Sequence, residues 1–135
     1  MKILIVDDHA LIRDALRGVL KELRGDVAVL EAADSREAMA IVAEQVDLGF
    51  ILLDLDLPDR DGFAVLSELR ERYPAISVVV LADRQDRNSV PKALDLGALG
   101  FIPKSSGREV MLSALRLVFA GGIYVPPEAI MPEEP

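Results

Sequence analysis

Cysteine is absent from the 135-residue sequence, and histidine occurs once. Without cysteine the chain can form neither a disulfide framework nor a thiolate metal site, and a reducing cytoplasm is the expected location. Long hydrophobic runs are absent as well. The first apolar run stops at Asp7, too early for a signal peptide, and no segment reaches the roughly 18 apolar residues of a membrane span. We therefore expect neither export through a signal peptide nor insertion into a membrane.

Basic residues are in short supply. The sequence has 15 Lys and Arg against 23 Asp and Glu, which gives a net charge of -8. This balance opposes contact with a polyanion, so we expect no direct nucleic-acid binding by this chain. Hydrophobic residues make up 51% and charged residues 28%, as is typical of a folded globular protein. The length fits one compact domain.

Five short apolar runs predict buried β-strands at residues 2–6, 27–30, 48–53, 77–82 and 99–103. The runs are almost entirely apolar rather than alternating, which is typical of parallel strands buried on both faces. Between them, apolar residues such as Leu16, Val19, Leu20 and Leu23 recur at helical spacing and predict helices with one stripe toward the sheet. Five βα units indicate a three-layer α/β sandwich around a five-stranded parallel sheet.

Capping residues and prolines predict where the fourth helix begins and where a C-terminal tail lies. Asn88 or Ser89 can cap a short fourth helix that has Pro91 near its first turn. Four prolines lie in the last ten residues, which favours an extended segment. We therefore predict one domain over residues 1–120 and a proline-rich linker or tail over residues 121–135.

Charged side chains gather at the carboxyl ends of three predicted strands: Asp7 and Asp8 after the first, Asp54 after the third, and Lys104 after the fifth. In open parallel sheets, ligands bind at these ends, where the strand order reverses. If the first and third strands are neighbours, three carboxylates converge. They repel one another unless a cation is present, and an all-oxygen set suits Mg²⁺. Lys104 and one Mg²⁺ would balance the three carboxylates and allow the site to accept a phosphoryl group.

Three motifs resemble a known family. "VDDH" at 6–9, "LLDLDLPDRDG" at 52–62 and "GFIPKS" at 100–105 together resemble the receiver domain of two-component response regulators. The resemblance implies a flavodoxin-like, CheY-like sheet in the order 2-1-3-4-5. Near the end, "ALRLVFAGGIYVPP" is similar to the end of receivers in transcriptional regulators of the LuxR or NarL/FixJ type. Those regulators carry a C-terminal helix-turn-helix domain, which these 135 residues do not contain.

This resemblance implies a role for each charged residue of the site. Asp54 corresponds to the phosphoacceptor and Lys104 to the lysine that pairs with the phosphoryl oxygens. Asp8 corresponds to a direct Mg²⁺ ligand, while Asp7 would hold the ion partly through water. The carboxylate of Asp54 and the backbone carbonyl of Asp56 would complete the protein ligands. The implied activity is acceptance of a phosphoryl group from a sensor histidine kinase, which is a signalling role and not metabolic catalysis.

Two positions are implied to act as a conformational switch. Phe101 matches the aromatic residue whose rotamer reports the switch. Ala82 stands where the family carries Thr or Ser, so the hydroxyl that binds the phosphoryl group is missing. A hydrogen bond to a charged partner contributes about 1.5 to 3 kcal/mol, so its loss is expected to weaken the coupling between phosphorylation and output roughly tenfold or more. Asp83 follows and would oppose a phosphoryl group if it faced the site.

The resemblance also suggests partners and leaves alternatives open. A homodimer could use the surface of the fourth helix, fifth strand and fifth helix, or that of the first and fifth helices. Control of transcription would belong to an effector domain outside this chain. One alternative is an interaction module that keeps the fold without using phosphate, as Ala82 and Asp83 suggest. Another is a small Mg²⁺-dependent phosphatase with Asp54 as nucleophile.

Several polar residues near the motifs have simpler explanations. Asp59 and Asp61 belong to a stretch typical of turns, with Gly62 expected to supply unusual dihedral angles, and we assign them no catalytic role. A calcium loop is excluded because its first ligand would be Leu57. His9 is interpreted as a surface residue at a helix start, since a single histidine without partners rarely has a chemical role.

Overall fold

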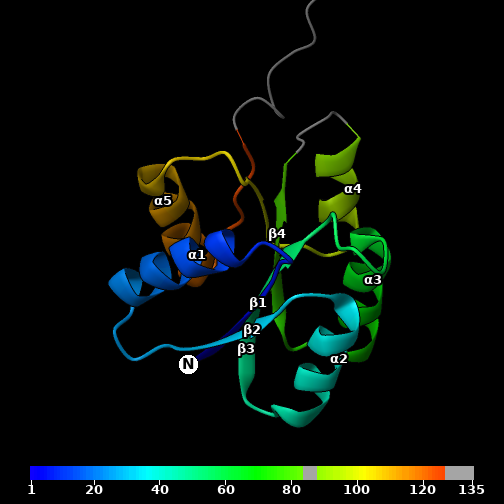
Figure 1. Cartoon of the computed structure of the whole chain (residues 1–135). Coiled ribbons are helices and arrows are strands. Elements are labelled where there is room, and N and C mark those ends of the chain that lie inside the picture. Colours follow the sequence, from blue (N-terminus) through cyan, green and yellow to red (C-terminus); the bar gives the residue numbers. More distant parts are fainter. Residues whose placement is uncertain (84–87, 127–135) are drawn as a thin grey trace, which may run out of the picture.

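Five apolar segments form one parallel sheet in the computed structural model, which describes residues 1–83 and 88–126 (Figure 1). The strand order is β2-β1-β3-β4-β5, and all four neighbouring pairs are parallel. This confirms the predicted sheet and its order. The strands are β1 Lys2–Val6, β2 Ala28–Ala32, β3 Leu48–Asp54, β4 Ser77–Ala82 and β5 Gly100–Pro103.

Helices cover both faces of the sheet, as predicted for a three-layer sandwich. Figure 1 shows α1 and α5 on one face, with α2, α3 and α4 on the other. Among residues 1–83 and 88–126, no helix combines the length and apolar character that crossing a membrane requires. The helices are α1 Ala10–Leu23, α2 Ser35–Glu44, α3 Gly62–Arg72, α4 Ser89–Asp95 and α5 Arg108–Phe119.

The strands divide their side chains between two apolar cores. In β4, Val79 and Leu81 pack with the residues of α1 and α5, whereas Val78 and Val80 pack with those of α2, α3 and α4. All four are buried. Burial on both faces explains why the central strands read as continuous apolar runs.

The predicted second strand was displaced by one to two residues. Residues 27–30 were expected, but β2 is Ala28–Ala32 and includes the charged residue Glu31. Because β2 lies at the edge of the sheet, four of its five positions are only partly buried or exposed. An apolar run therefore does not mark this strand. Glu31 instead forms ion pairs with Arg13 and Arg17 of α1.

Gly62 is required for space and not for its dihedral angles, so that expectation was wrong. Among the described residues, positive φ angles occur only at Gly97 and Gly121. A Cβ on Gly62 would lie 2.4 Å from Leu55 Cα and 2.5 Å from the Leu55 carbonyl oxygen. The start of α3 thus lies directly against the chain that leaves β3, and Gly62 N–H donates a hydrogen bond to Leu55 O.

The beginning of the predicted tail lies along the sheet. Tyr124 forms a parallel bridge with Gly100. Its N–H donates to Leu99 O at 3.1 Å, and its carbonyl accepts from Phe101 N–H at 3.0 Å. Val125 packs against the core on the α2–α4 side. Tyr124 therefore pairs with the outer edge of β5, whereas residues 127–135 of the predicted tail lie outside the described residues.

Candidate functional site

The sheet order brings the carboxyl ends of β1 and β3 together. Val6 is in register with Leu53, so Asp7 and Asp54 leave neighbouring strands at the same edge. The two carboxylates are fully buried. The main chain of Asp7 is fixed by a hydrogen bond from its N–H to Ala32 O at 3.0 Å. Strand order and register thus produce the predicted convergence of acids.

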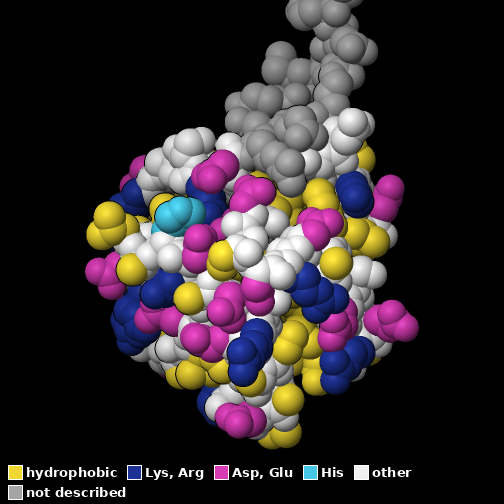
Figure 2. All heavy atoms as spheres, turned by 45° about the vertical axis from the view of Figure 1, so that its right-hand side comes forward, with side chains coloured by type: hydrophobic (Ala, Val, Ile, Leu, Met, Phe, Trp, Pro, Cys, Tyr) yellow, Lys and Arg dark blue, Asp and Glu magenta, His cyan; other side chains and the backbone are white. Residues whose placement is uncertain are grey.

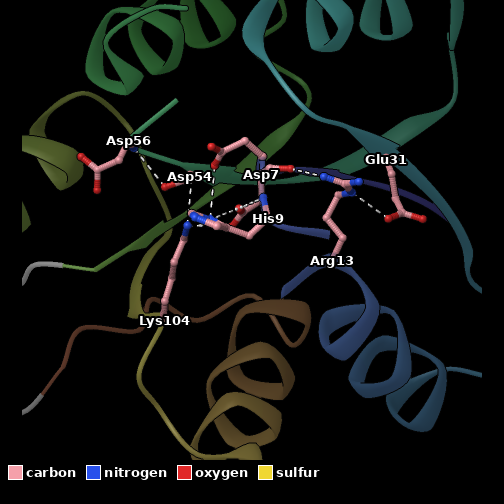
Figure 3. A network of polar contacts seen from close by, with 8 residues as sticks. Asp7, His9, Arg13, Glu31, Asp54, Asp56 and Lys104 are labelled. Carbon is pink, nitrogen blue, oxygen red and sulfur yellow. Dashed lines mark hydrogen bonds and ion pairs between the residues drawn. The ribbon is translucent and has the colours of Figure 1, made fainter. Parts of the chain in front are cut away.

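Lys104 lies between these two carboxylates (Figure 3). Its Nζ is 2.8 Å from Asp7 Oδ2 and 2.8 Å from Asp54 Oδ2, and its side chain is only 4% exposed. The amine forms an ion pair with each of the two oxygens, but none of the three atoms has a hydrogen bond of good geometry. The Lys104 N–H donates to Ala82 O at 2.8 Å, which extends the pairing of β4 with β5 and directs the amine inward.

Both oxygens of the buried Asp54 carboxyl group have a neighbour. Burial raises the pKa of its carboxyl group, and the contact with Lys104 and the hydrogen bond from Asp56 N–H only partly oppose that rise. The Asp56 bond, to Asp54 Oδ1, is 3.0 Å long. Burial also disfavours the charged amine of Lys104, but its contacts with Asp54 and Asp7 outweigh that effect and raise the pKa of Lys104. The lysine therefore stays protonated beside the acids at neutral pH.

Asp7, Asp8, Asp54 and Lys104 form a site that we call the acidic pocket, and Asp8 and His9 lie on its solvent-exposed side. The Asp8 side chain is 34% exposed, and His9 Nδ1 lies 3.2 Å from Asp8 Oδ1. The same nitrogen lies 3.0 Å from Asp7 Oδ1. His9 is the N-cap of α1, as expected for a residue at a helix start. Its contact with both acids was not predicted, and its adjacency to Asp7 and Asp8 in the sequence was the available signal.

The donor set suits a hard divalent cation. Asp7, Asp8 and Asp54 each offer a carboxylate oxygen, and these oxygens lie with His9 nitrogen within 4.8 Å of one another. Three carboxylates and one lysine leave an excess of two negative charges, which a divalent ion would neutralise. The buried Oδ2 atoms of Asp7 and Asp54 share the single Lys104 amine as their cationic partner, so the negative charge of the two carboxylates is only partly balanced. The residues present therefore fit Mg²⁺.

Asp56 contributes to the site through its backbone. Its N–H bonds Asp54 Oδ1, while its carboxylate points away from Asp54 in Figure 3. The side chain is thus not a member of the acidic cluster among the described residues. The role of its carbonyl as a metal ligand stays a prediction.

Arg13 supports the pocket and was missed by the sequence reasoning. Its Nη1 donates to the backbone carbonyl of Asp7 at 2.6 Å, and its Nε donates to Glu31 Oε1 at 2.9 Å. It thereby ties the β1–α1 connection to β2 (Figure 3). Hydrogen bonding by Arg17, and to a smaller extent by Arg13, holds the pKa of Glu31 below its usual value, although partial burial opposes this.

Asp59 and Asp61 lie outside the acidic cluster and act on helix ends. Asp61 is the N-cap of α3 and accepts a hydrogen bond from Phe63 N–H at 3.1 Å. Asp59 reaches across to α2, where it accepts from Ser35 N–H at 3.0 Å, Ser35 Oγ–H at 2.8 Å and Arg36 N–H at 3.2 Å. Of the four aspartates between residues 54 and 61, one is in the cluster and two bind helix termini.

Ala82 and Phe101 lie on the face of the sheet covered by α2, α3 and α4. Both are completely buried and belong to the same apolar core. Phe101 is in register with Val80 of β4, two residues before Ala82. Asp83, the next residue, is exposed and is not in the acidic cluster. The structure thus brings the two switch positions to one face, while their role in switching stays a prediction.

Known proteins are similar to this chain over most of its length. The sequence profile of the response regulator receiver domain matches residues 3–116. The chain is 40% identical over 129 residues to the glycerol metabolism activator of Pseudomonas putida, covering 96% of this chain and 58% of that protein. It is 38% identical over 125 residues to the transcriptional activator protein ExaE of Pseudomonas putida, covering 93% of this chain and 58% of that protein.

Solved structures show the same fold. A LuxR family DNA-binding response regulator from Silicibacter pomeroyi superposes with a TM-score of 0.83 at 30% identity, covering 95% of this chain and 98% of that one. The isolated receiver domain of RcsB from Salmonella enterica gives a TM-score of 0.85 at 24% identity, covering 96% and 95%. The chain spans less than two thirds of the length of the two Pseudomonas putida relatives.

Proposed function

The chain belongs to the response regulator receiver domain family, and on this basis we propose that Asp54 accepts a phosphoryl group from a sensor histidine kinase. The observation that carries the proposal is the position of Asp54: a buried carboxylate at the end of β3, 2.8 Å from the Lys104 amine and beside two further acids. Receiver domains are signalling domains and not metabolic enzymes, so the phosphatase alternative is not retained.

The proposed step is a phosphoryl transfer. An Asp54 carboxylate oxygen bonds to phosphorus while the bond between phosphorus and the imidazole nitrogen of the kinase breaks, giving an acyl phosphate and free histidine. When bound, Mg²⁺ would reduce the negative charge that opposes the approach of the phosphoryl group. Asp8, Asp54 and the carbonyl of Asp56 would hold it, with Asp7 acting partly through water.

Lys104 and the Asp56 amide position the nucleophile. The Asp56 N–H holds Asp54 Oδ1, which limits rotation of the carboxylate and leaves Oδ2 toward Lys104. After transfer, the Lys104 amine can move from Asp54 Oδ2 to a phosphoryl oxygen and keep its ion pair with Asp7. The positive charge is then already in place where negative charge develops.

Intact-mass spectrometry after incubation with acetyl phosphate and Mg²⁺ tests this proposal. We expect the wild-type chain to gain one phosphoryl group and Asp54→Asn to gain none. Asp14→Asn is the matched control, because Asp14 is an exposed acid of α1 outside the cluster. Failure of the wild-type chain to be labelled, or labelling of Asp54→Asn at another residue, would contradict the proposal.

Ala82 favours a second candidate, an interaction module that no longer uses phosphate. The side chain at the end of β4 is completely buried and offers no hydroxyl for a phosphoryl oxygen. If the wild-type chain takes up the phosphoryl group, this candidate loses its basis. If it takes up none while remaining folded, the interaction module becomes the better account.

Control of transcription by this protein would require an effector domain and a second copy of the chain. Because the Pseudomonas putida relatives are named as activators and are longer than this chain, we propose that it controls transcription in the cytoplasm through an effector domain outside these 135 residues. Exposed apolar residues on the first and fifth helices, Leu11, Val110 and Leu117, support a homodimer through α1 and α5. The alternative surface, α4–β5–α5, has the edge of β5 lined by Tyr124.

A further inference from the structure

Arg13 contacts the acidic pocket from the side opposite to its opening. The pocket is open to solvent at His9, the single histidine of the chain, which Figure 2 shows in cyan with acidic side chains near it. The His9 side chain is 57% exposed, whereas that of Arg13 is 19% exposed. Arg13 extends from the first turn of α1 and lies between Asp7 and Glu31 (Figure 3). A phosphoryl donor that enters beside His9 therefore does not meet Arg13, and any effect of Arg13 on the site must pass through the residues it contacts.

The backbone carbonyl of Asp7 depends on Arg13 for its hydrogen bond. Asp7 follows the last residue of β1 and is fully buried, so its carbonyl lies beyond the strand pairing and away from water. Arg13 Nη1 donates to this oxygen at 2.6 Å, and among residues 1–83 and 88–126 no backbone N–H does so. A buried carbonyl requires a donor, and a charged donor forms the stronger bond. Loss of the guanidinium would therefore turn the peptide group between Asp7 and Asp8 toward another donor.

Two consecutive residues of β2 hold both peptide groups that flank Asp7. The carbonyl of Ala32 accepts from Asp7 N–H at 3.0 Å. The carboxylate of Glu31 accepts from Arg13 Nε at 2.9 Å and so holds the guanidinium whose Nη1 reaches the Asp7 carbonyl. The edge strand thus fixes Asp7 directly on its N-terminal side, and through Arg13 on its C-terminal side.

The position of the Asp7 main chain also determines where the amine of Lys104 lies. Asp7 Oδ2 is 2.8 Å from Lys104 Nζ, which is itself 2.8 Å from Asp54 Oδ2. The Lys104 side chain is only 4% exposed, so it has little room to follow a movement of Asp7. The peptide group that Arg13 holds leads directly into Asp8, whose direction it therefore fixes as well. A misplacement of about 1 Å in a reacting site can lower the rate roughly 100-fold.

We propose that Arg13 is a positioning residue for phosphoryl acceptance at Asp54 and that it acts through the carbonyl of Asp7. The inference rests on the proposed function, because it concerns the rate of the same transfer. It gives the edge strand β2 and the first turn of α1 a part in that transfer, although neither supplies a group that touches the phosphoryl donor. Glu31 contributes by holding the guanidinium in place.

Arg17 provides a matched control, because it shares Glu31 with Arg13 and forms no bond with Asp7. The two arginines are four residues apart and lie on one face of α1, and Arg17 Nη2 contacts Glu31 Oε2. Arg13→Met keeps an apolar stem of similar length but has no donor for the Asp7 carbonyl. Arg17→Met removes the other arginine at Glu31 and leaves the Asp7 carbonyl bonded. Arg13→Lys restores a charged donor at the first position.

Nitrogen-15 NMR of the backbone amides tests the position of the peptide group without any phosphoryl transfer. The Asp8 nitrogen belongs to the same peptide group as the Asp7 carbonyl, so its signal reports on the hydrogen bond from Arg13. We expect Arg13→Met to shift the Asp8 signal and Arg17→Met to leave it in place. An unmoved Asp8 signal in Arg13→Met, or equal shifts in the two variants, would overturn the inference.

The rate of labelling by acetyl phosphate and Mg²⁺, followed by intact-mass spectrometry, provides the second measurement. We expect Arg13→Met to be labelled roughly tenfold more slowly than the wild type, since partners that orient metal ligands from outside a site typically contribute 10- to 100-fold to affinity or activity. Arg17→Met should be labelled at the wild-type rate, and Arg13→Lys should recover part of the rate. Equal rates for Arg13→Met and the wild type, or no recovery in Arg13→Lys, would contradict the inference.

The inference and the proposed function can fail separately. If the wild-type chain takes up no phosphoryl group, the proposed function fails, whereas the Asp8 signal still shows whether Arg13 holds the peptide group. If the wild type and Arg13→Met are labelled at the same rate, only the role of Arg13 fails. Urea denaturation of each variant identifies a loss of rate that is due to unfolding, and Arg13→Lys keeps the test valid if Arg13→Met does not fold.

Discussion

The acidic pocket contains more negative than positive charge, because one lysine amine serves two buried carboxylates. Removing the charge of Asp54 relieves its repulsion with Asp7, while Lys104 keeps Asp7 as partner. We predict that Asp54→Asn raises the free energy of unfolding in Mg²⁺-free buffer by on the order of 1 kcal/mol. Urea denaturation at neutral pH measures this difference.

Mg²⁺ should reduce the stability difference between Asp54→Asn and the wild type, whereas a rise in pH should increase it. Mg²⁺ binds the folded wild-type pocket and stabilises it by mass action, so the advantage of Asp54→Asn should shrink at saturating Mg²⁺. Because the pKa of Asp54 is raised from 3.8, the folded protein holds its proton longer than the unfolded chain. The wild type should therefore lose stability relative to the variant as the pH rises above 3.8. A variant less stable than the wild type in Mg²⁺-free buffer at neutral pH would contradict this account.

Replacement of glycine by alanine is expected to have opposite effects on stability at Gly62 and at Gly18. A Cβ on Gly62 would lie 2.4 Å from the backbone of Leu55, so we predict that Gly62→Ala destabilises the protein by about 3 kcal/mol. Gly18 lies within α1 and has nothing within 4 Å of its Cβ position. Gly18→Ala should stabilise the protein by about 1 kcal/mol. Thermal unfolding of both variants tests the pair, and equal shifts would contradict the steric reason given for Gly62.

Ala82 gives a direct test of the missing hydroxyl. We predict that Ala82→Thr increases the phosphorylation-dependent shift or dimerisation roughly tenfold, since a hydrogen bond to a charged group contributes about 1.5 to 3 kcal/mol. Ala82→Val is the control because it has a similar shape without the hydroxyl. Chromatography and NMR, with and without acetyl phosphate, measure the response. If Thr and Val behave alike, the hydroxyl does not limit the switch.

The site residues that could be predicted are those placed by strand ends. Asp7, Asp54 and Lys104 directly follow or end apolar runs, and the parallel order then brings them together. The requirement for Gly62 could not be predicted in this way, because it arises from the approach of α3 to Leu55 in three dimensions. The contact of His9 with the acids depends on the turn into α1, which hydrophobic periodicity does not describe.

At the scale of elements, α2 is anchored by an acid from another loop. Asp59 accepts hydrogen bonds from Ser35 and Arg36 and thus links the β3–α3 loop to the N-terminus of α2. The two elements are joined by charge and dipole as well as by apolar packing. The same loop carries Asp56, whose N–H donates a hydrogen bond to Asp54 Oδ1. The contacts of Asp59 with α2 therefore also help to fix the loop that positions Asp54.

We predict that Asp59→Ala accelerates hydrogen exchange at the amides of Ser35 and Arg36, while exchange in α5 is unchanged. Hydrogen bonds from Ser35 hold the pKa of Asp59 below 3.8. The stabilisation is therefore fully present above that pH and is lost as the pH falls through the lower folded value. The stability difference between the wild type and Asp59→Ala should vanish in that acidic range. Asp34→Ala, which removes the α2 N-cap at Glu37 N–H, provides a comparison.

Element boundaries could be predicted for the buried strands and less well at the edge. The bounds of β1 and β4 match the apolar runs at residues 2–6 and 77–82. β2 differs because an edge strand needs no apolar residue on its exposed side, and Glu31 is stabilised there by two arginines from α1. Ion pairs between elements leave no periodic signal in the sequence.

At the scale of the whole molecule, the segment around Tyr124 adds to the outer edge of the sheet. Two hydrogen bonds join it to Leu99 and Phe101, and Val125 is partly buried against the core. Unpaired strand edges are templates for association with other chains. The order of the five strands followed from the family resemblance, whereas this added pairing did not, because prolines after Tyr124 indicated an extended tail.

We predict that a chain ending after Gly122 is destabilised by about 2 kcal/mol, since two hydrogen bonds contribute roughly 1 kcal/mol each. Amide exchange at Phe101 should accelerate because its acceptor is removed, and self-association through the β5 edge should increase. A chain ending after Pro126 is the control, since it keeps the pairing. Urea denaturation, hydrogen exchange and light scattering measure the three effects. Equal stability of the two chains would show that the pairing contributes little.

The attachment of Tyr124 also determines how mechanical load enters the molecule. Tension on the polypeptide beyond Pro126 is borne first by the main chain at Leu99 and Phe101, and only after that by the end of α5. The peptide groups of Leu99 and Phe101 thus connect β5 directly to the chain that follows Tyr124. A small shift of β5 would displace Tyr124 with it, because no flexible segment lies between the two.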